Sequence, residues 1–203
     1  MANTLPIESL VDHPHFRRLD SIGAIRVDLR YAGNGNFVGQ DLYSPFDCAW
    51  LHRHAAERLE KAAGRLAAAR PDLSLLVLDA LRPQRVQERM WKALQGTDLT
   101  KYLADPVRGS IHSFGMAVDV TLIDSVGREL DMGTPFDDLT ERSHPVLERD
   151  FLANGGLVQA HIDNRAILRD AMIGSGWLGI TREWWHFDGG DRDTIRAGYV
   201  RIL

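Results

Sequence analysis

Residues 110–122 read Ser-Ile-His-Ser-Phe-Gly-Met-Ala-Val-Asp-Val-Thr-Leu. The second half of this stretch, 116–122, has the alternation typical of a strand and predicts a central β-strand that carries Asp119. His112 lies seven residues before Asp119, so on one strand the two side chains would point to opposite faces. Gly115 lies between them and permits a turn that brings the strand back beneath His112. The stretch therefore predicts an imidazole next to a carboxylate.

Asp119 is informative because it interrupts an apolar run. A carboxylate buried there needs a partner, and a cation would supply one. A salt bridge to an arginine would also do so. The alternative for the whole segment is a surface histidine and a solvated aspartate.

A second segment, Glu183-Trp184-Trp185-His186, opens a predicted strand over 184–188. Together the two segments supply two imidazoles and a carboxylate, the ligand set of a catalytic zinc ion. Cys48 is the single cysteine, so a structural zinc site built from cysteines is excluded. Glu183 is a candidate base for activating water, and the adjacent indoles would raise its pKa. The alternative is an aromatic edge strand with a structural histidine.

Arg82 is a further candidate, because it follows an apolar strand and precedes Pro83. Loops at strand ends are held by a rigid scaffold, and a fixed guanidinium can stabilise a developing oxyanion. The alternative is a surface arginine paired with Asp79 or Glu88. We interpret the remaining histidines as structural or surface residues, with His52 and His54 diverging because they lie two apart on a predicted helix. These residues are His13, His15, His52, His54, His144 and His161.

The rest of the chain shows mixed periodicities. Strands are predicted over 24–31 and 73–78, and helices over 47–69, 83–95 and 164–174, the last capped by Asp163. Because strands and helices do not alternate regularly, we predict an α+β fold in a single domain, residues 1–203. Its small, mostly antiparallel central sheet would be flanked by helices and would carry the zinc site.

Composition excludes several classes of function. The 203 residues carry a formal net charge of −4, which offers no basic face for nucleic acid. The N-terminal residues lack a signal-peptide pattern, and no apolar stretch is long enough to span a bilayer. We therefore expect a cytoplasmic protein with no nucleic-acid or membrane partner. The oligomeric state is left open.

The pattern Ser-x-His-x-x-Gly-x-Ala-x-Asp, followed far downstream by Glu-Trp-Trp-His, resembles the D-alanyl-D-alanine dipeptidases, zinc enzymes of the vancomycin-resistance type. The resemblance extends from about Tyr31 to Phe187. It includes the segments 28–32, 81–83, 132–137 and 141–144. Ile111 and Phe114 depart from the family pattern, and both flank the predicted metal site.

The resemblance implies that one Zn²⁺ per chain is held by His112, Asp119 and His186. It also implies that Glu183 is the catalytic base and that Arg82 stabilises the tetrahedral intermediate. The ammonium end or the C-terminal portion of a small D,D-dipeptide would be received by Tyr31, Ser110 and Asp137. The alternatives are a D,D- or L,D-carboxypeptidase that acts on peptidoglycan stem peptides, and a non-catalytic zinc-binding module.

Overall fold

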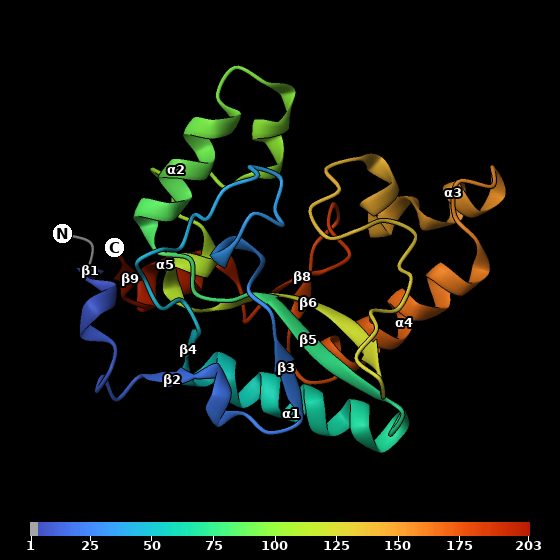
Figure 1. Ribbon diagram of the computed structural model, residues 1–203, viewed down its shortest axis with the longest axis horizontal. Coiled ribbons are helices and arrows are strands. Elements are labelled where there is room, and N and C mark those ends of the chain that lie inside the picture. Colours follow the sequence, from blue (N-terminus) through green and yellow to red (C-terminus); the bar gives the residue numbers. More distant parts are fainter. Residues whose placement is uncertain (1–3) are drawn as a thin grey trace.

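The structure is a computed structural model that describes residues 4–203, and its centre is a five-stranded sheet (Figure 1). The strand order is β3-β5-β6-β8-β7. The parallel pair is β3 with β5, and all other neighbours are antiparallel. The strands are β3 (Ile25–Val27), β5 (Leu73–Asp79), β6 (Ala117–Asp124), β7 (Leu178–Gly179) and β8 (His186–Asp188). The predicted α+β class with a mostly antiparallel sheet is thus confirmed.

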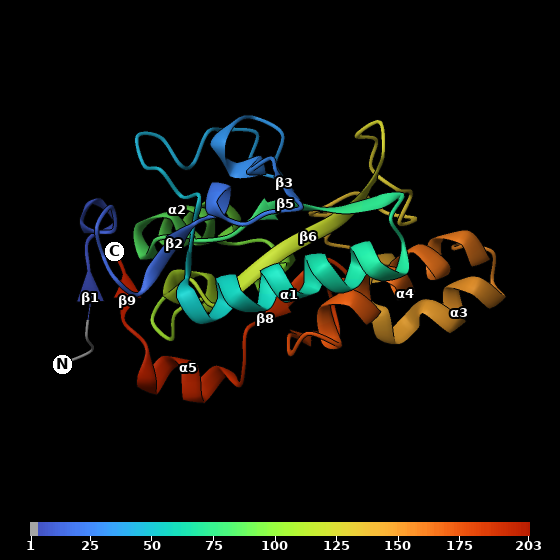
Figure 2. The ribbon, with the colours of Figure 1, turned by 90° about the horizontal axis from the view of Figure 1, so that it is seen from below.

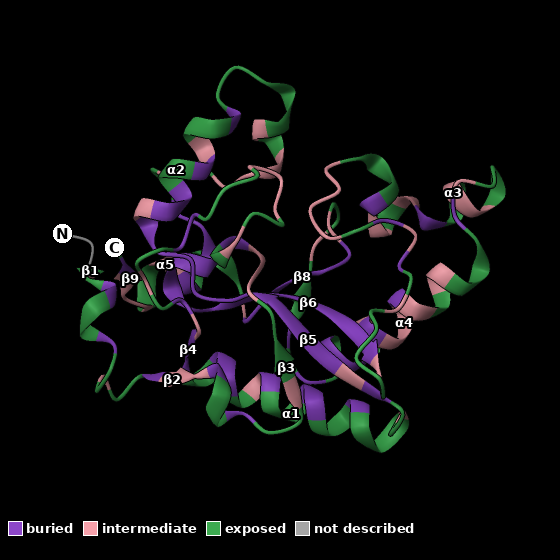
Figure 3. Cartoon of the chain, in the orientation of Figure 1, coloured by how far each residue is buried: buried purple, intermediate pink, exposed green. Residues whose placement is uncertain are grey.

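Two helices, α1 (Arg53–Ala69) and α4 (Gln159–Ile173), cover one face of this sheet (Figure 2). The buried side of α1 repeats at helical spacing, which aims its apolar stripe at the strands. Leu59 and Leu66 of this stripe belong to the same core cluster as Val118 and Val120 of β6. Packing against α1 therefore fixes the strand that carries Asp119, and the centre of the sheet is buried throughout (Figure 3).

The other elements surround the sheet. The remaining helices are α2 (Gln84–Leu94), α3 (Glu148–Ala153) and α5 (Arg192–Gly198). Two small two-stranded sheets pair β1 (Thr4–Leu5) with β9 (Arg201–Ile202), and β2 (Phe16–Arg18) with β4 (Trp50–His52). Within residues 4–203, no helix is both long enough and apolar enough to cross a membrane.

In the structure, three elements have bounds that differ from those predicted from the sequence. The helix expected over 47–69 begins at Arg53, because residues 50–52 form β4 and pair with β2. The helix expected over 164–174 begins at Gln159, so Asp163 lies inside it and Val158 precedes it. The strand expected over 24–31 is confined to Ile25–Val27, and a 3₁₀ turn follows at Arg30–Ala32.

Candidate active site

Strand pairing brings Asp119 and His186 together although 67 residues separate them. They are direct register partners on the antiparallel strands β6 and β8. His112 lies in a 3₁₀ turn, Ile111–Phe114, which ends at Gly115 in the left-handed conformation with φ of 62°. That turn returns the chain into β6 and places His112 beside Asp119, as the sequence predicted.

The three side chains present converging atoms that could hold a metal ion. Asp119 Oδ1 lies 3.0 Å from His186 Nδ1 and 3.5 Å from His112 Nε2, and the two imidazole nitrogens are 3.2 Å apart. Tetrahedral zinc ligands, each about 2.0–2.1 Å from the ion, are about 3.3 Å from one another. The spacing and the chemistry of these donors therefore fit a zinc ion.

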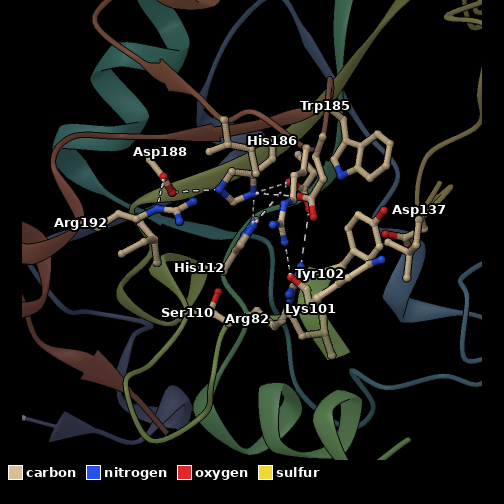
Figure 4. A pocket seen from close by; sticks show the side chains of 18 of the residues that line it. Arg82, Lys101, Tyr102, Ser110, His112, Asp137, Trp185, His186, Asp188 and Arg192 are labelled. Atoms are coloured by element: carbon tan, nitrogen blue, oxygen red, sulfur yellow. Dashed lines mark hydrogen bonds and ion pairs between the residues drawn. The ribbon is translucent and has the colours of Figure 1, made fainter. Parts of the chain in front are cut away.

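Each imidazole is oriented by a partner on its other nitrogen, and Figure 4 shows the partner of His186. His112 Nδ1 donates to the backbone oxygen of Ala80 at 2.7 Å, which leaves Nε2 facing the centre. His186 Nε2 contacts Asp188 Oδ1 at 2.9 Å, and Arg192 donates to the other oxygen of Asp188 at 2.6 Å. Such outer partners fix the tautomer and the ring orientation of metal-binding histidines.

Glu183 lies beside this triad, with Oε2 at 3.9 Å from His186 Nδ1. Its side chain is 14% exposed. Burial raises the pKa of Glu183 to about 7, although His186 acts in the opposite direction. A carboxylate with this pKa can both accept and return a proton near neutral pH.

Arg82 is buried and held on several sides. Its Nε donates to Asp79 at 2.9 Å and its Nη1 donates to Gln87 at 3.1 Å, while Nη2 lies 3.5 Å from Asp119. The guanidinium also stands over the Tyr31 ring, 5.0 Å from its centroid. The predicted alternative, a pairing with Asp79, is thus present as well, but the pair is buried and not on the surface.

Tyr31 and Asp137 form a polar group near the same centre. The Tyr31 hydroxyl donates to the Asp137 carboxylate, at 2.9 Å from each oxygen. Burial and then the charge of Asp119 raise the pKa of Asp137 well above its usual value. Asp137 also adopts a φ of 61°, an uncommon conformation for a residue with a side chain. A ligand ammonium next to Asp137 would favour its charged form.

One cavity of about 370 Å³ gathers all these side chains. Its lining includes every residue that the sequence singled out, namely Tyr31, Arg82, Ser110, His112, Asp119, Asp137, Glu183 and His186. It also includes residues that the sequence analysis missed, among them Lys101, Tyr102, Arg182, Asp188 and Arg192. Asp188 had a usable signal, because it follows His186 by two residues on one strand and so shares its face.

The prediction that His52 and His54 diverge is wrong. His52 ends strand β4 and His54 is the second residue of helix α1, so the two residues do not lie on one helix. Their ring centroids are 4.7 Å apart. Both line a second cavity, which has no lining residue in common with the first.

This chain is similar to one protein family and to several known proteins. The peptidase M15 family, described as D-ala-D-ala dipeptidase, matches residues 14–201. A D-alanyl-D-alanine dipeptidase of Escherichia coli (strain K12) is 37% identical over 164 residues, covering 81% of this chain and 78% of the relative. One from Enterococcus faecium is 32% identical over 194 residues, covering 85% and 90%. One from Synechocystis sp. is 31% identical over 216 residues, covering 92% and 79%. A match over nearly the whole chain, reaching both strands that carry the converging side chains, places this protein in the D-ala-D-ala dipeptidase family, peptidase M15.

Proposed function

We propose that this protein hydrolyses the dipeptide D-Ala-D-Ala to two molecules of D-alanine, with one zinc ion held by His112, Asp119 and His186. The observation that carries the proposal is the convergence of these three donors beside the Glu183 carboxylate, which lies 3.9 Å from His186 Nδ1. A bound zinc ion would supply Lewis acidity, which polarises a carbonyl and makes a nearby water more acidic.

The side chains of the chain divide the remaining work. Glu183 takes the proton of the attacking water and returns it to the leaving amine. Arg82, held by Asp79 and Gln87, stabilises the negative charge that develops on the carbonyl oxygen. Because its guanidinium is positioned before the reaction, little reorganisation is needed when that charge forms.

The cavity selects a dipeptide because its side chains bind both ends of the substrate. Asp137, with the Tyr31 hydroxyl, binds the free ammonium, and Ser110 contacts the C-terminal portion. A longer peptide carries an amide in place of that ammonium, which leaves the Asp137 carboxylate without its partner. The cavity of about 370 Å³ is consistent with a small substrate.

The test is D-alanine release from D-Ala-D-Ala by the zinc-loaded protein, with Glu183→Ala alongside. We expect the wild type alone to release D-alanine, and Glu183→Ala to keep its zinc while activity falls about 10²–10⁴-fold. Glu57→Ala, an exposed site on α1, is the matched control and should remain active. Efficient trimming of a stem pentapeptide with no dipeptide cleavage would favour the carboxypeptidase, and zinc binding without hydrolysis would favour the non-catalytic module.

A further inference from the structure

The second cavity, of about 710 Å³, is lined by histidines from two distant parts of the chain. His13 and His15 precede β2, whereas His52 ends β4 and His54 lies in the first turn of α1. The pairing of β2 with β4 sets Phe16 opposite His52, which brings these two His-x-His pairs together. The His15 and His52 rings are stacked, with centroids 6.0 Å apart.

Basic side chains gather here without an acidic partner. The other described residues that line this cavity are Leu5, Arg53, Gly198, Tyr199 and Val200. None of the described lining residues carries a carboxylate. Across residues 4–203, none of these four histidines forms an ion pair with an acidic side chain, and neither does Arg53. Any positive charge that the cavity acquires is therefore unneutralised by the protein.

The start of α1 adds to this potential. The helix is 17 residues long and has no acidic residue in its first turn, where Arg53 and His54 stand instead. A helix N-terminus carries a partial positive charge that favours anions. In many helices, acidic side chains in the first turn offset this partial positive charge. In α1, basic side chains stand there instead and add to it.

His52 is a largely buried residue whose side chain lines the cavity. The residue is 7% exposed, and its Nδ1 accepts the backbone N–H of His54 at 3.3 Å. Nε2 therefore carries the proton of the neutral ring, and within the described chain it has no hydrogen-bond acceptor. Burial, followed by the neighbouring His54 and His15, lowers the pKa of His52 to about 4.

We propose that this cavity binds an oxyanion, the phosphate, sulfate or carboxylate group of a small molecule. Imidazole N–H groups and the Arg53 guanidinium are the donors that such a group requires, and the Tyr199 hydroxyl holds the His54 ring through a hydrogen bond of 3.0 Å to Nδ1. A metal ion is less favoured, because among the described residues these ring nitrogens do not converge as those of His112 and His186 do. The site is separate from the proposed catalytic centre and does not depend on its activity.

The experiment titrates sulfate into the zinc-loaded full chain at pH 6 and pH 8, followed by calorimetry and by the histidine ring signals in NMR. Sulfate remains a dianion at both pH values, so a change in its affinity with pH reflects a change in the protonation of the protein. We expect saturable binding that is several-fold tighter at pH 6, with ring shifts at His13, His15, His52 and His54. The double variant His15→Gln/His54→Gln should bind about tenfold more weakly, as expected for loss of a charge-assisted hydrogen bond.

Two controls make the result decisive. His144→Gln/His161→Gln removes two histidines outside this cavity and should bind sulfate as the wild type does. Arg53→Gln, an exposed substitution, provides a second test should the double variant fail to fold. Parallel titrations with inorganic phosphate and acetate distinguish a phosphoryl from a carboxylate ligand by which one binds more tightly.

Three outcomes would overturn the proposal. The first is the absence of saturable sulfate binding by the wild type. The second is equal affinity in the wild type and in both cavity variants, which would place the anion elsewhere, for example near Lys101 and Arg182. The third is a second zinc ion that the wild type binds and His15→Gln/His54→Gln does not, which would make this a metal site.

Discussion

At the scale of single residues, the proposed zinc centre depends on which nitrogen of each imidazole is free. The Asp188 carboxylate occupies His186 Nε2 and is itself held by Arg192, so Nδ1 is the atom that faces Asp119. The carbonyl of Ala80 occupies His112 Nδ1, so Nε2 is the atom of that ring that faces the centre. The orientation of the donors is thus built by residues that do not themselves face the ion.

Removing the Asp188 carboxylate should weaken metal binding. We expect Asp188→Ala to lower zinc affinity about 10–100-fold, because the His186 ring loses the partner that fixes its tautomer. Asp188→Asn retains an acceptor oxygen and should recover part of the loss. The measurement is zinc competition with a chelator, and Asp72→Ala, at an exposed pair with Arg70, is the control. Wild-type zinc affinity in Asp188→Ala would contradict the assignment.

The proposed contact between Asp137 and the substrate ammonium should make the effect of an Asp137 substitution depend on the substrate. Asp137→Asn should reduce kcat/KM for D-Ala-D-Ala about 10–100-fold, because a hydrogen bond between charged groups is lost. N-acetyl-D-Ala-D-Ala has no ammonium, so Asp137→Asn should hardly change its slow hydrolysis. Steady-state kinetics on both substrates make the comparison. An equal loss on both would mean that Asp137 acts on the reaction and not on the ammonium.

At the scale of elements, the turn between His112 and β6 leaves no room for a side chain. A Cβ at Gly115 would lie 2.8 Å from the backbone nitrogen of His52, and the residue has a φ of 62°. Gly127 also has a positive φ, 84°, but a Cβ there would meet nothing within 4 Å. Alanine substitutions at the two glycines therefore distinguish the cost of backbone strain from the cost of a steric clash.

We expect Gly127→Ala to lower the free energy of unfolding by about 1–2 kcal/mol, the cost of the left-handed conformation. Gly115→Ala should cost more, because the added methyl group also meets the β4 backbone. It should weaken zinc binding as well, since His112 moves with the turn, whereas Gly127→Ala should not. Urea unfolding and zinc competition measure both effects. Equal stability losses and intact zinc affinity in Gly115→Ala would show that the turn adjusts freely.

Local patterns predicted the elements whose periodicity agrees with their burial. Strand β5 and helix α2 are close to their predicted bounds, because an apolar run and a proline mark them. The pairing of residues 50–52 with β2 depends on contacts with residues 16–18, which no local pattern contains. The sequence motifs grouped the residues of the candidate site, and the two-residue spacing offered a signal for the contact of Asp188 with His186. The meeting of the two His-x-His pairs could not be predicted, because it depends on the pairing of β2 with β4.

At the scale of the whole molecule, the two cavities differ in electrostatic character although one turn connects them. The backbone N–H of His52 donates to the oxygen of Gly115 at 2.9 Å, so the histidine cluster abuts the turn that carries His112. Both acidic and basic side chains line the first cavity, whereas the described lining of the second has basic ones and no acidic one. Acid should therefore affect stability at the second cavity.

His52 provides the pH dependence of that effect. Its pKa is about 4 in the folded protein and near 6.5 when unfolded, so the unfolded chain binds the proton first as pH falls. The stabilisation from a neutral, buried His52 is complete above about pH 6.5 and is lost as pH falls toward 4. Between pH 7 and pH 5 the loss should be about 1 kcal/mol, after allowing for solvent screening.

The variant His52→Asn isolates this contribution, because asparagine also caps a helix but does not titrate. In sulfate-free buffer, urea unfolding at pH 7 and pH 5 should show a smaller acid-induced loss for His52→Asn than for the wild type, by about 1 kcal/mol. The other titrating groups are common to the two proteins, and those that do not interact with His52 cancel in the difference. Equal losses would mean that the protonated ring is accommodated by solvent, and that the cavity lacks the positive potential from which we infer its anion.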